Sequence, residues 1–381
     1  MIDRPMTDSL LREACAAFAF GGDVTDIRPC GNGHINSTFI ITAGEGSSSR
    51  RYILQVVNTD IFRDPDGVMA NICRVTAHIR AGLVASGGDA ERGCLQVVPT
   101  ADYGAPDPTV PDSFRYIDRD GRFWRAYEYT EHTVCRLTLD SPDTFRKVGW
   151  AFGNFQHQLA DFDAACLQES IPNFHNTARR WESFADVLSR DPVGRAAQAA
   201  PEIEYIRARA GKCSLIVDAL ASGELPLRVT HNDTKLSNIL LDEDTGDCVC
   251  VIDLDTVMPG SALYDFGDSI RTGACTAAED EPNSELVDFR ADMFRAYVEG
   301  FIAGTAGALT PREIAMLPDG AYIITLEQAI RFLTDYLEGD TYYHIEYPDH
   351  NLIRTRTQIR MLMGMERDEA LLREIVATFH S

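Results

Sequence analysis

The segment LRVTHNDTKLSNILLDEDTGDCVCVIDLDTVMPG, residues 227–260, decides how this chain is interpreted. It contains two short hydrophobic runs, residues 239–241 and 249–252, which an acidic stretch with one glycine separates. Short β-type runs joined by a glycine-containing turn are typical of a hairpin. The sequence therefore predicts two antiparallel strands in a region whose pattern is otherwise mainly helical.

Polar side chains stand at one end of each predicted strand. Asp233 and Asn238 precede the first strand, and Asp253 and Asp255 follow the second. Because a hairpin brings these two ends together, we expect three carboxylates and one amide to converge. Oxygen ligands without cysteine or histidine favour a hard cation, Mg²⁺ or Mn²⁺, over zinc. The segment therefore predicts a divalent-metal site.

The spacing within this segment indicates phosphoryl transfer. Asp233, Lys235 and Asn238 have the spacing of the protein-kinase catalytic loop, in which Lys and Asn follow the catalytic Asp at fixed distances. Asp253 then stands where a magnesium-binding Asp would follow. An Asp- and Asn-rich hairpin is also ordinary turn chemistry, but the ordered set favours the functional interpretation. His231 is expected to be a structural histidine that bonds nearby backbone.

Several motifs carry a resemblance to a known superfamily. They are GNGHIN near the start, THNDTKLSNILLD, VIDLDTVMPG and YDFGDSIR in the middle, and LEQAIRFLTDYLEGDTYY near the end. With these motifs the chain resembles the aminoglycoside phosphotransferase and choline kinase superfamily. More closely, it resembles the N-acetylhexosamine 1-kinases, which phosphorylate the anomeric hydroxyl of GlcNAc and GalNAc. The likeness extends over most of the chain.

The resemblance implies an α+β, protein-kinase-like fold of two lobes. A small antiparallel-sheet lobe, residues 1–130, would cover the nucleotide. A larger, mainly helical lobe, residues 131–381, would carry the catalytic loop and the substrate site. The pattern agrees, because strand-like runs fill the first third and helical spacing dominates from Ser141 onward, where Ser141-Pro142 reads as a helix start. The strand-like runs cover residues 51–58, 94–99 and 123–129, and the helical patterns include residues 66–82, 181–188, 201–221, 287–303, 321–337 and 368–379.

The implied cofactors are ATP and Mg²⁺, and the resemblance assigns roles around them. Asp233 would orient the acceptor hydroxyl and take its proton, with Lys235 beside it. Asn238 and Asp253 would hold Mg²⁺, and Asp255 is a further candidate ligand. Transfer of the phosphoryl group would be direct and in line.

The nucleotide site is expected in the first lobe. A glycine-rich hairpin would let backbone amides approach the phosphates. The next strand has Gln55 where protein kinases have a phosphate-binding lysine, and an amide cannot neutralise a phosphate. The metal and Lys235 would then have to neutralise more of the phosphate charge. The residues expected to bind the nucleotide are Gly31, Gly33, His34, Asn36, Gln55, Glu128 and Tyr129, the last two through their backbone.

The acceptor site is expected on a late helix and the loop after it. Arg331 and Tyr342 match the sugar-contacting Arg and Tyr of the resembled group, and their donors and aromatic face suit a polyhydroxylated ring. The alternative is that Arg331 pairs with Glu327 one helical turn before it. Asp268 and Arg271 are expected to support the catalytic loop through an ion pair.

The predicted function is therefore that of an ATP-dependent kinase acting on the anomeric hydroxyl of an N-acetylhexosamine. One alternative is another kinase of the superfamily, acting on choline, homoserine, methylthioribose or an aminoglycoside, whose acidic pockets would fit the net charge. A second alternative is a catalytically weak, nucleotide-binding pseudokinase. The missing lysine favours it, and the intact Asp233, Asn238 and Asp253 oppose it.

Composition narrows the partners. The chain has 381 residues, a formal net charge of −23 and a pI of about 4.7. That field repels nucleic acid and anionic membranes, and no apolar run approaches the ~18 residues of a membrane span. The expected partner is a small molecule, an amino sugar, in the cytoplasm, and the oligomeric state is left open. The cysteines are scattered without a CxxC pair, so buried free thiols are expected.

Overall fold

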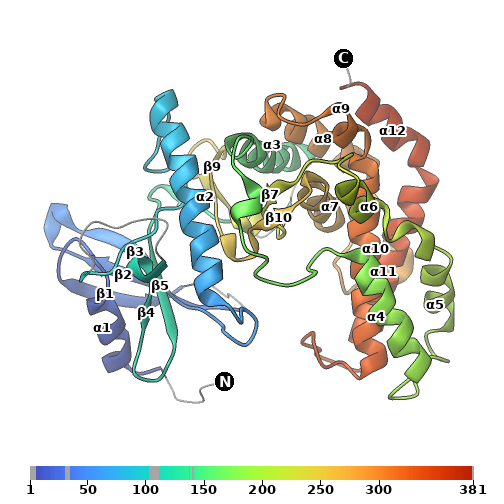
Figure 1. The fold of residues 1–381 in the computed structure, drawn as a ribbon, viewed down its shortest axis with the longest axis horizontal. Coiled ribbons are helices and arrows are strands. Elements are labelled where there is room, and N and C mark those ends of the chain that lie inside the picture. Colours follow the sequence, from blue (N-terminus) through green and yellow to red (C-terminus); the bar gives the residue numbers. More distant parts are fainter. Residues whose placement is uncertain (1–5, 31–34, 103–110, 137, 140, 380–381) are drawn as a thin grey trace. The chain divides into compact units, whose positions relative to one another are not determined.

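The structure is a computed structural model that describes residues 6–30, 35–102, 111–136, 138–139 and 141–379. The chain divides into two compact units (Figure 1). The sheet unit consists of Met1–Cys135, Asp161–Ile171 and Leu240–Met258. The helical unit consists of Arg136–Ala160, Pro172–Ile239 and Pro259–Ser381.

The sheet unit is built on a five-stranded antiparallel sheet (Figure 1). Along β2 and β3, buried and more exposed residues alternate, as expected for a sheet with one face on a core. Helix α1 (Asp8–Ala16) packs on that face, where Leu11 and Cys15 join Ile41 and Leu54 in one hydrophobic core. In spatial order the strands are β1 (Val24–Pro29), β2 (Ser37–Ala43), β3 (Arg50–Val56), β5 (Phe123–Glu128) and β4 (Tyr116–Ile117).

Strand β5 is paired on both of its edges. Towards β3, Gln55 stands directly opposite Arg125. On the other edge the sequence predicts a strand over residues 94–99, but the structure has an isolated bridge between Val97 and Tyr127. This prediction of a full strand is wrong, because β4 occupies the remaining part of the same edge.

The predicted hairpin lies at the start of the third segment of the sheet unit. Strands β8 (Ile239–Asp242) and β9 (Cys248–Val251) are neighbours, and β6 (Thr133–Val134) pairs with β8 on its other side. The hairpin prediction is therefore confirmed, with strand bounds shifted by one residue.

Helix α2 (Pro65–Ser86) joins the segments of the sheet unit to one another. The buried Asn71 amide on α2 donates to the carbonyl of Gln168 at 2.7 Å and to that of Val257 at 2.9 Å. The first segment of the unit ends at Cys135, whereas the sequence places a lobe boundary at residue 130. That division into two continuous lobes stays a prediction.

The helical unit begins with a helix whose start the sequence predicts correctly. The Ser141 hydroxyl accepts from the Thr144 N–H at 3.2 Å, and Pro142 is the first residue of α3. Short strands β7 (Arg228–Thr230) and β10 (Met258–Gly260) pair with each other. The helices are α3 (Pro142–Gln158), α4 (Thr177–Arg190), α5 (Ala200–Arg207), α6 (Leu215–Ala221), α7 (Ala262–Gly273), α8 (Ala291–Thr305), α9 (Pro311–Ala315), α10 (Leu317–Glu338), α11 (His350–Arg367) and α12 (Glu369–Ala377).

Some helical predictions need correction. The single helix expected over residues 201–221 is two helices, α5 and α6, because the chain turns between them around Gly211, a residue of low helix propensity. The helix expected from residue 287 begins at Ala291. Helices α7, α9 and α11 were not predicted.

The predicted fold class is confirmed: a small antiparallel-sheet lobe is combined with a larger, mainly helical lobe. In the part of the chain that the structure describes, no helix combines the length and the apolar character that crossing a membrane requires. The cysteines are free thiols, as expected, but Cys135 and Cys166 are exposed, so the prediction of burial is wrong for these two.

Helices α3 and α8 pack closely through glycines. A Cβ atom at Gly300 of α8 would collide with the carbonyl oxygen of Arg146 on α3. A Cβ atom at Gly153 of α3 would collide with the carbonyl oxygen of Phe301 on α8. The two backbones therefore lie closer together than side chains on both helices would permit.

We expect Gly300→Ala to lower the free energy of unfolding by about 1–3 kcal/mol, because the added methyl group has no room. Gly211→Ala is the matched control, since a Cβ there meets nothing within 4 Å. Urea unfolding of both variants measures the difference. Equal effects of the two changes would contradict the close packing of α3 and α8.

Candidate active site

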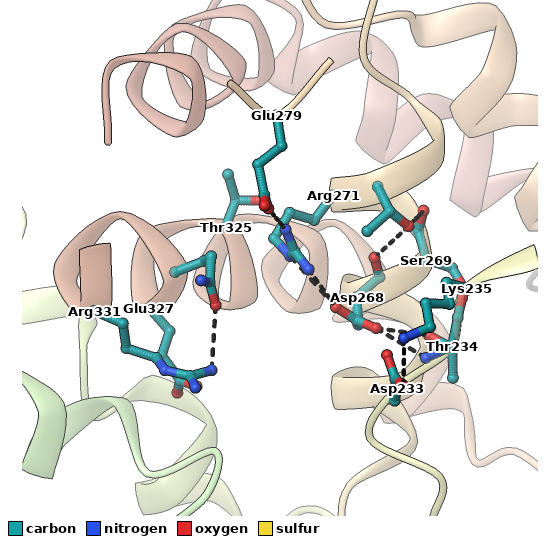
Figure 2. A network of polar contacts seen from close by, with 12 residues as sticks. Asp233, Thr234, Lys235, Asp268, Ser269, Arg271, Glu279, Thr325, Glu327 and Arg331 are labelled. Atoms are coloured by element: carbon teal, nitrogen blue, oxygen red, sulfur yellow. Dashed lines mark hydrogen bonds and ion pairs between the residues drawn. The ribbon is translucent and has the colours of Figure 1, made fainter. Parts of the chain in front are cut away.

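The predicted catalytic loop lies in the helical unit between β7 and β8, and its last turn is a 3-10 helix, Leu236–Asn238. The Asn238 amide nitrogen donates to the carbonyl of Asp233 at 2.8 Å and to its carboxylate at 2.9 Å. Lys235 Nζ lies 2.8 Å from the same carboxylate (Figure 2). The structure thus brings Asp233, Lys235 and Asn238 together around one carboxylate.

A buried carboxylate on α7 holds the backbone just before Asp233. Asp265 accepts hydrogen bonds from the N–H groups of His231 at 3.0 Å and Asn232 at 2.8 Å. The Gln156 amide on α3 donates to the same carboxylate at 2.9 Å. Burial raises the pKa of Asp265, although these donors and His231 favour its ionised form. The burial of this acid is thus compensated by bonds that fix the loop.

A second α7 carboxylate holds the backbone just after Asp233. Asp268 accepts from the Thr234 N–H at 2.8 Å and pairs with Arg271 at 3.0 Å, which confirms the predicted ion pair (Figure 2). Arg271 in turn pairs with Glu279 at 2.5 Å. Burial opposes ionisation of Asp268, but Arg271 and the other donors outweigh it, so the pKa of Asp268 is lowered.

His231 is buried, and its ring packs edge-on against Phe152 at 5.5 Å and Phe155 at 5.8 Å. Its Nδ1 atom accepts from the Asp233 N–H at 3.3 Å. These contacts agree with the structural role expected from the sequence, because the ring supports the backbone of the loop.

The remaining predicted metal ligands follow β9 in the sheet unit. Asp253 has a left-handed backbone, with φ of 61°, and immediately precedes a 3-10 turn, Leu254–Thr256. The buried Asp255 carboxylate lies 2.5 Å from Arg125 Nη1 and accepts from the Asn36 amide at 2.7 Å. Both oxygens of Asp255 therefore have protein partners within the sheet unit.

Arg125 is a charged residue of this site that sequence reasoning missed. It is 1% exposed, and its Nε atom donates to Gln55 Oε1 at 3.0 Å. The Gln55 amide nitrogen donates to the Thr38 hydroxyl at 3.0 Å. Gln55 stands where a lysine is expected in a kinase, and the cation of this region lies on the adjacent strand. The sequence did contain a sign of this role, because Arg125 stands among aromatic and apolar residues in the strand FWRAYE.

The other predicted nucleotide contacts are only partly described. Gly31, Gly33 and His34 lie outside the described residues. The backbone N–H groups of Glu128 and Tyr129 donate to the carbonyls of Gln96 at 2.9 Å and Arg51 at 3.1 Å. Their role in binding adenine stays a prediction.

The two residues predicted to bind the acceptor, Arg331 and Tyr342, lie in different surroundings. Arg331 Nη1 donates to Gln328 Oε1 at 3.2 Å, and its guanidinium lies 5.7 Å from the ring of Tyr343. Tyr342 is 70% exposed and packs its ring edge-on against Tyr343. Of these two adjacent tyrosines, Tyr343 is the one whose ring lies beside Arg331. The contact of Tyr342 with an acceptor stays a prediction.

The expected alternative partner of Arg331 is engaged elsewhere. Glu327 accepts from His175 Nδ1 at 2.9 Å and from the Thr177 hydroxyl at 2.7 Å. Among the described residues, no ion pair joins Glu327 to Arg331. Figure 2 shows both residues on α10, in one view with Asp268 and the catalytic loop.

The donor set fits Mg²⁺ rather than a softer metal. Asn238 turns its amide nitrogen to Asp233, so its Oδ1 atom is the ligand it can offer, and Asp253 offers a carboxylate. No cluster of three or more acidic, His or Cys side chains forms a metal site among the described residues. Mg²⁺ in phosphoryl-transfer sites is commonly held by one or two carboxylates together with substrate phosphates, so a smaller protein set suffices. The convergence of Asn238 with Asp253 stays a prediction.

Comparison with known proteins agrees with this geometry. Residues 26–298, more than half of the chain, match the phosphotransferase enzyme family. The chain belongs to this family. The aminoglycoside phosphotransferase and choline kinase resemblance is thereby confirmed at the level of the superfamily.

Solved structures share the fold of this phosphotransferase. A spectinomycin phosphotransferase, solved with ADP and spectinomycin, is 12% identical with a TM-score of 0.56 over 96% of this chain and 100% of its own. A choline/ethanolamine kinase family protein from Mesorhizobium loti is 18% identical with a TM-score of 0.53 over 97% and 100%. A choline kinase from Cryptosporidium parvum Iowa II is 10% identical with a TM-score of 0.53 over 98% and 99%. At these identities the likeness concerns the fold.

We expect Asp268→Asn to lower the free energy of unfolding by about 3–5 kcal/mol near neutral pH, because it removes a buried partner of Arg271. Since the pKa of Asp268 is lowered by folding, its contribution is present above the ordinary Asp value of 3.8 and is lost as the pH falls through the lower folded value. The difference between wild type and variant should therefore shrink below about pH 4.

Asp186→Asn on α4 is the matched control for this change, because its ion pair with Arg190 is exposed. It should cost about 0–1 kcal/mol. Urea unfolding at several pH values measures both variants. A loss at Asp268 no larger than that at Asp186 would mean that α7 does not hold the loop through this carboxylate.

The Arg125–Asp255 pair should behave as one unit. We expect Arg125→Met alone to cost about 3–5 kcal/mol, because it leaves the Asp255 carboxylate buried without its cation. Arg125→Met combined with Asp255→Leu should recover most of that loss. Denaturant unfolding of both single variants and the double variant measures the coupling. Additive losses would show that the two side chains do not depend on each other.

Proposed function

We propose that this phosphotransferase moves the γ-phosphoryl group of ATP onto the anomeric hydroxyl of an N-acetylhexosamine, GlcNAc or GalNAc. The observation that carries the kinase part is the Asp233 carboxylate, held between Lys235 and Asn238 on a loop whose backbone two buried carboxylates fix. Phosphoryl transfer depends on positioning and on electrostatic stabilisation, and a carboxylate in this setting can supply both. The sugar part rests on the sequence motifs.

Asp233 acts on the acceptor hydroxyl. Its carboxylate accepts a hydrogen bond from that hydroxyl, orients the oxygen towards the γ-phosphorus and takes the proton as the new O–P bond forms. The bond between the γ-phosphorus and the bridging oxygen breaks, and ADP leaves. Lys235 lies beside the carboxylate and places positive charge next to the transferring group.

Residues of the amino-terminal strands and of the segment 227–260 are proposed to hold the nucleotide and its metal. Asn238 and Asp253 would hold Mg²⁺, with Asp255 a further candidate, and the bound ion would neutralise charge on the phosphates. Gln55 can donate its amide to a phosphate oxygen. The proposed nucleotide site is completed by the glycine-rich segment with Gly31, Gly33, His34 and Asn36 and by the backbone of Glu128 and Tyr129.

Arg331 and Tyr342 are proposed to contact the sugar. Arg331 presents a guanidinium flanked by the rings of Phe174 at 5.5 Å and Tyr343 at 5.7 Å. A fork of donors between aromatic faces suits a ring with several hydroxyls. This support is chemical and is compatible with more than one sugar.

Two observations favour other candidates. The fold neighbours include a spectinomycin phosphotransferase and a choline kinase, so another small-molecule acceptor is the first alternative. Gln55 in place of lysine favours the second, a catalytically weak nucleotide-binding protein. Release of ADP separates the second alternative from all kinases.

The deciding experiment measures ADP release with Mg-ATP against a panel of free sugars, choline, homoserine, methylthioribose and aminoglycosides. Turnover with GlcNAc or GalNAc, with a ³¹P signal coupled to the anomeric proton, supports the proposal. Turnover with another acceptor alone keeps the kinase assignment and refutes the sugar. Nucleotide binding without any ADP release refutes the kinase.

Asp233→Asn should lower turnover about 10²–10⁴-fold, because the positioned base is lost. Binding of Mg-ATP, measured by calorimetry, should change little. Asp244→Asn in the exposed hairpin turn is the matched control and should leave turnover as in wild type. Retained turnover in Asp233→Asn would remove Asp233 from its catalytic role.

A further inference from the structure

Arg331 is a positioned cation that makes no direct ion pair with an acid among the described residues, although the charge of Glu327 acts on it from a distance. Among the described residues, no carboxylate lies within 4.0 Å of its guanidinium, which is held by Gln328 and by the aromatic rings on either side. Glu327, one helical turn away, is bound to His175 and Thr177 instead. The guanidinium therefore keeps donors that its own helix does not use.

A second arginine faces the same region from α4. Arg180 donates through one Nη atom to the carbonyl of Phe174 at 3.1 Å, and the ring of Phe174 also flanks Arg331. Its buried Nε atom has no hydrogen-bond partner in the described part of the chain. Burial lowers the pKa of Arg180, and the nearby charge of Arg331 lowers it further, whereas the charge of Glu327 acts in the opposite direction. Two cations are thus held close enough to repel each other.

The neighbouring acids are committed to other groups. Asp268 binds Arg271 and the catalytic-loop backbone. Asp335 on α10 accepts from the backbone N–H groups of Tyr342 at 2.8 Å and Tyr343 at 3.0 Å. In a chain of net charge −23, this region is therefore locally rich in donors and poor in free acceptors.

We infer that Arg180 and Arg331 form a subsite that selects acceptors bearing oxygen acceptors and no positive charge, and that Arg180 is a specificity-determining residue. This inference rests on the proposed small-molecule kinase, with the acceptor held near Arg331. Guanidinium groups donate to carbonyl, hydroxyl and carboxylate oxygens, whereas an ammonium group offers them only donors and a like charge. Neutral or anionic acceptors fit such a subsite, and choline, ethanolamine and aminoglycosides do not.

Arg180 adds a contact that the sequence motifs do not provide. Arg331 lies in the motif resembling that of the sugar kinases, but Arg180 lies on α4, outside every motif on which the resemblance rests. Its position next to Arg331 follows from the packing of α4 against α10. The two arginines together therefore restrict the acceptors to neutral or anionic molecules, whichever sugar is the substrate.

The test uses two acceptors that differ only in the group on C2: GlcNAc carries a neutral acetamide with a carbonyl oxygen, and glucosamine carries an ammonium at a pH at which its amine is protonated. We expect kcat/KM for GlcNAc to exceed that for glucosamine about tenfold or more, since like charges brought together disfavour binding. Arg180→Met should narrow this ratio, and Arg180→Lys should largely restore it. Thermal stabilisation by each sugar, at matched ionic strength, gives a readout that does not need turnover.

Arg179→Met is the matched control, because Arg179 is the adjacent residue of α4, is 65% exposed and pairs with Glu182 on the surface. It removes the same charge and should leave the ratio unchanged. An equal response to the two sugars in wild type, including no response to either, overturns the inference. Preferred turnover of choline or an aminoglycoside also overturns it, while leaving the kinase assignment intact. Absence of ADP release with every acceptor refutes the proposed function itself.

Discussion

The carboxylate of Asp265 is the contact on which the rest of the site depends. Burying a charged group is costly unless hydrogen bonds replace water, and here the donors include backbone N–H groups on the approach to Asp233. Asp268 takes the N–H on the other side. Helix α7 therefore holds the predicted catalytic loop through two of its carboxylates. Hydrogen bonds from the loop backbone to these two α7 carboxylates fix its conformation on both sides of Asp233.

Helix α7 also links this loop to Arg331, the residue proposed to contact the acceptor. It packs against α10 through glycine, since a Cβ at Gly267 would collide with the carbonyl of Gly320. Arg331 is carried on α10, and Asp233 is held by α7, so one close helix contact fixes the cation relative to the carboxylate. The buried polar network and the glycine contact thus serve a common purpose, which is to place groups from distant parts of the sequence in one unit.

The contact of Lys235 and Asn238 with Asp233 could be predicted from sequence, because a short loop between two strands leaves its residues little conformational freedom. The start of α3 could be predicted as well, since Ser141 caps the helix and Pro142 begins it, and both effects depend only on neighbouring residues. Helix α7 was missed because its buried face includes acids, which interrupt the apolar period on which helix prediction relies. Arg125 could not be identified as the partner of Asp255, because that contact depends on strand register and on a residue far along the chain.

The sheet unit is assembled from three separated stretches of chain, and this has a consequence for biosynthesis. Asn71 on α2 donates to the carbonyl of Val257, and Arg125 on β5 pairs with Asp255, so these buried groups lack those partners when α2 and β5 leave the ribosome. They must wait until residues 240–258 have been synthesised. Contacts of such large sequence separation slow folding and leave nascent β-strands unprotected in the meantime. The amino-terminal region is therefore the part of this protein that would most need a chaperone during translation.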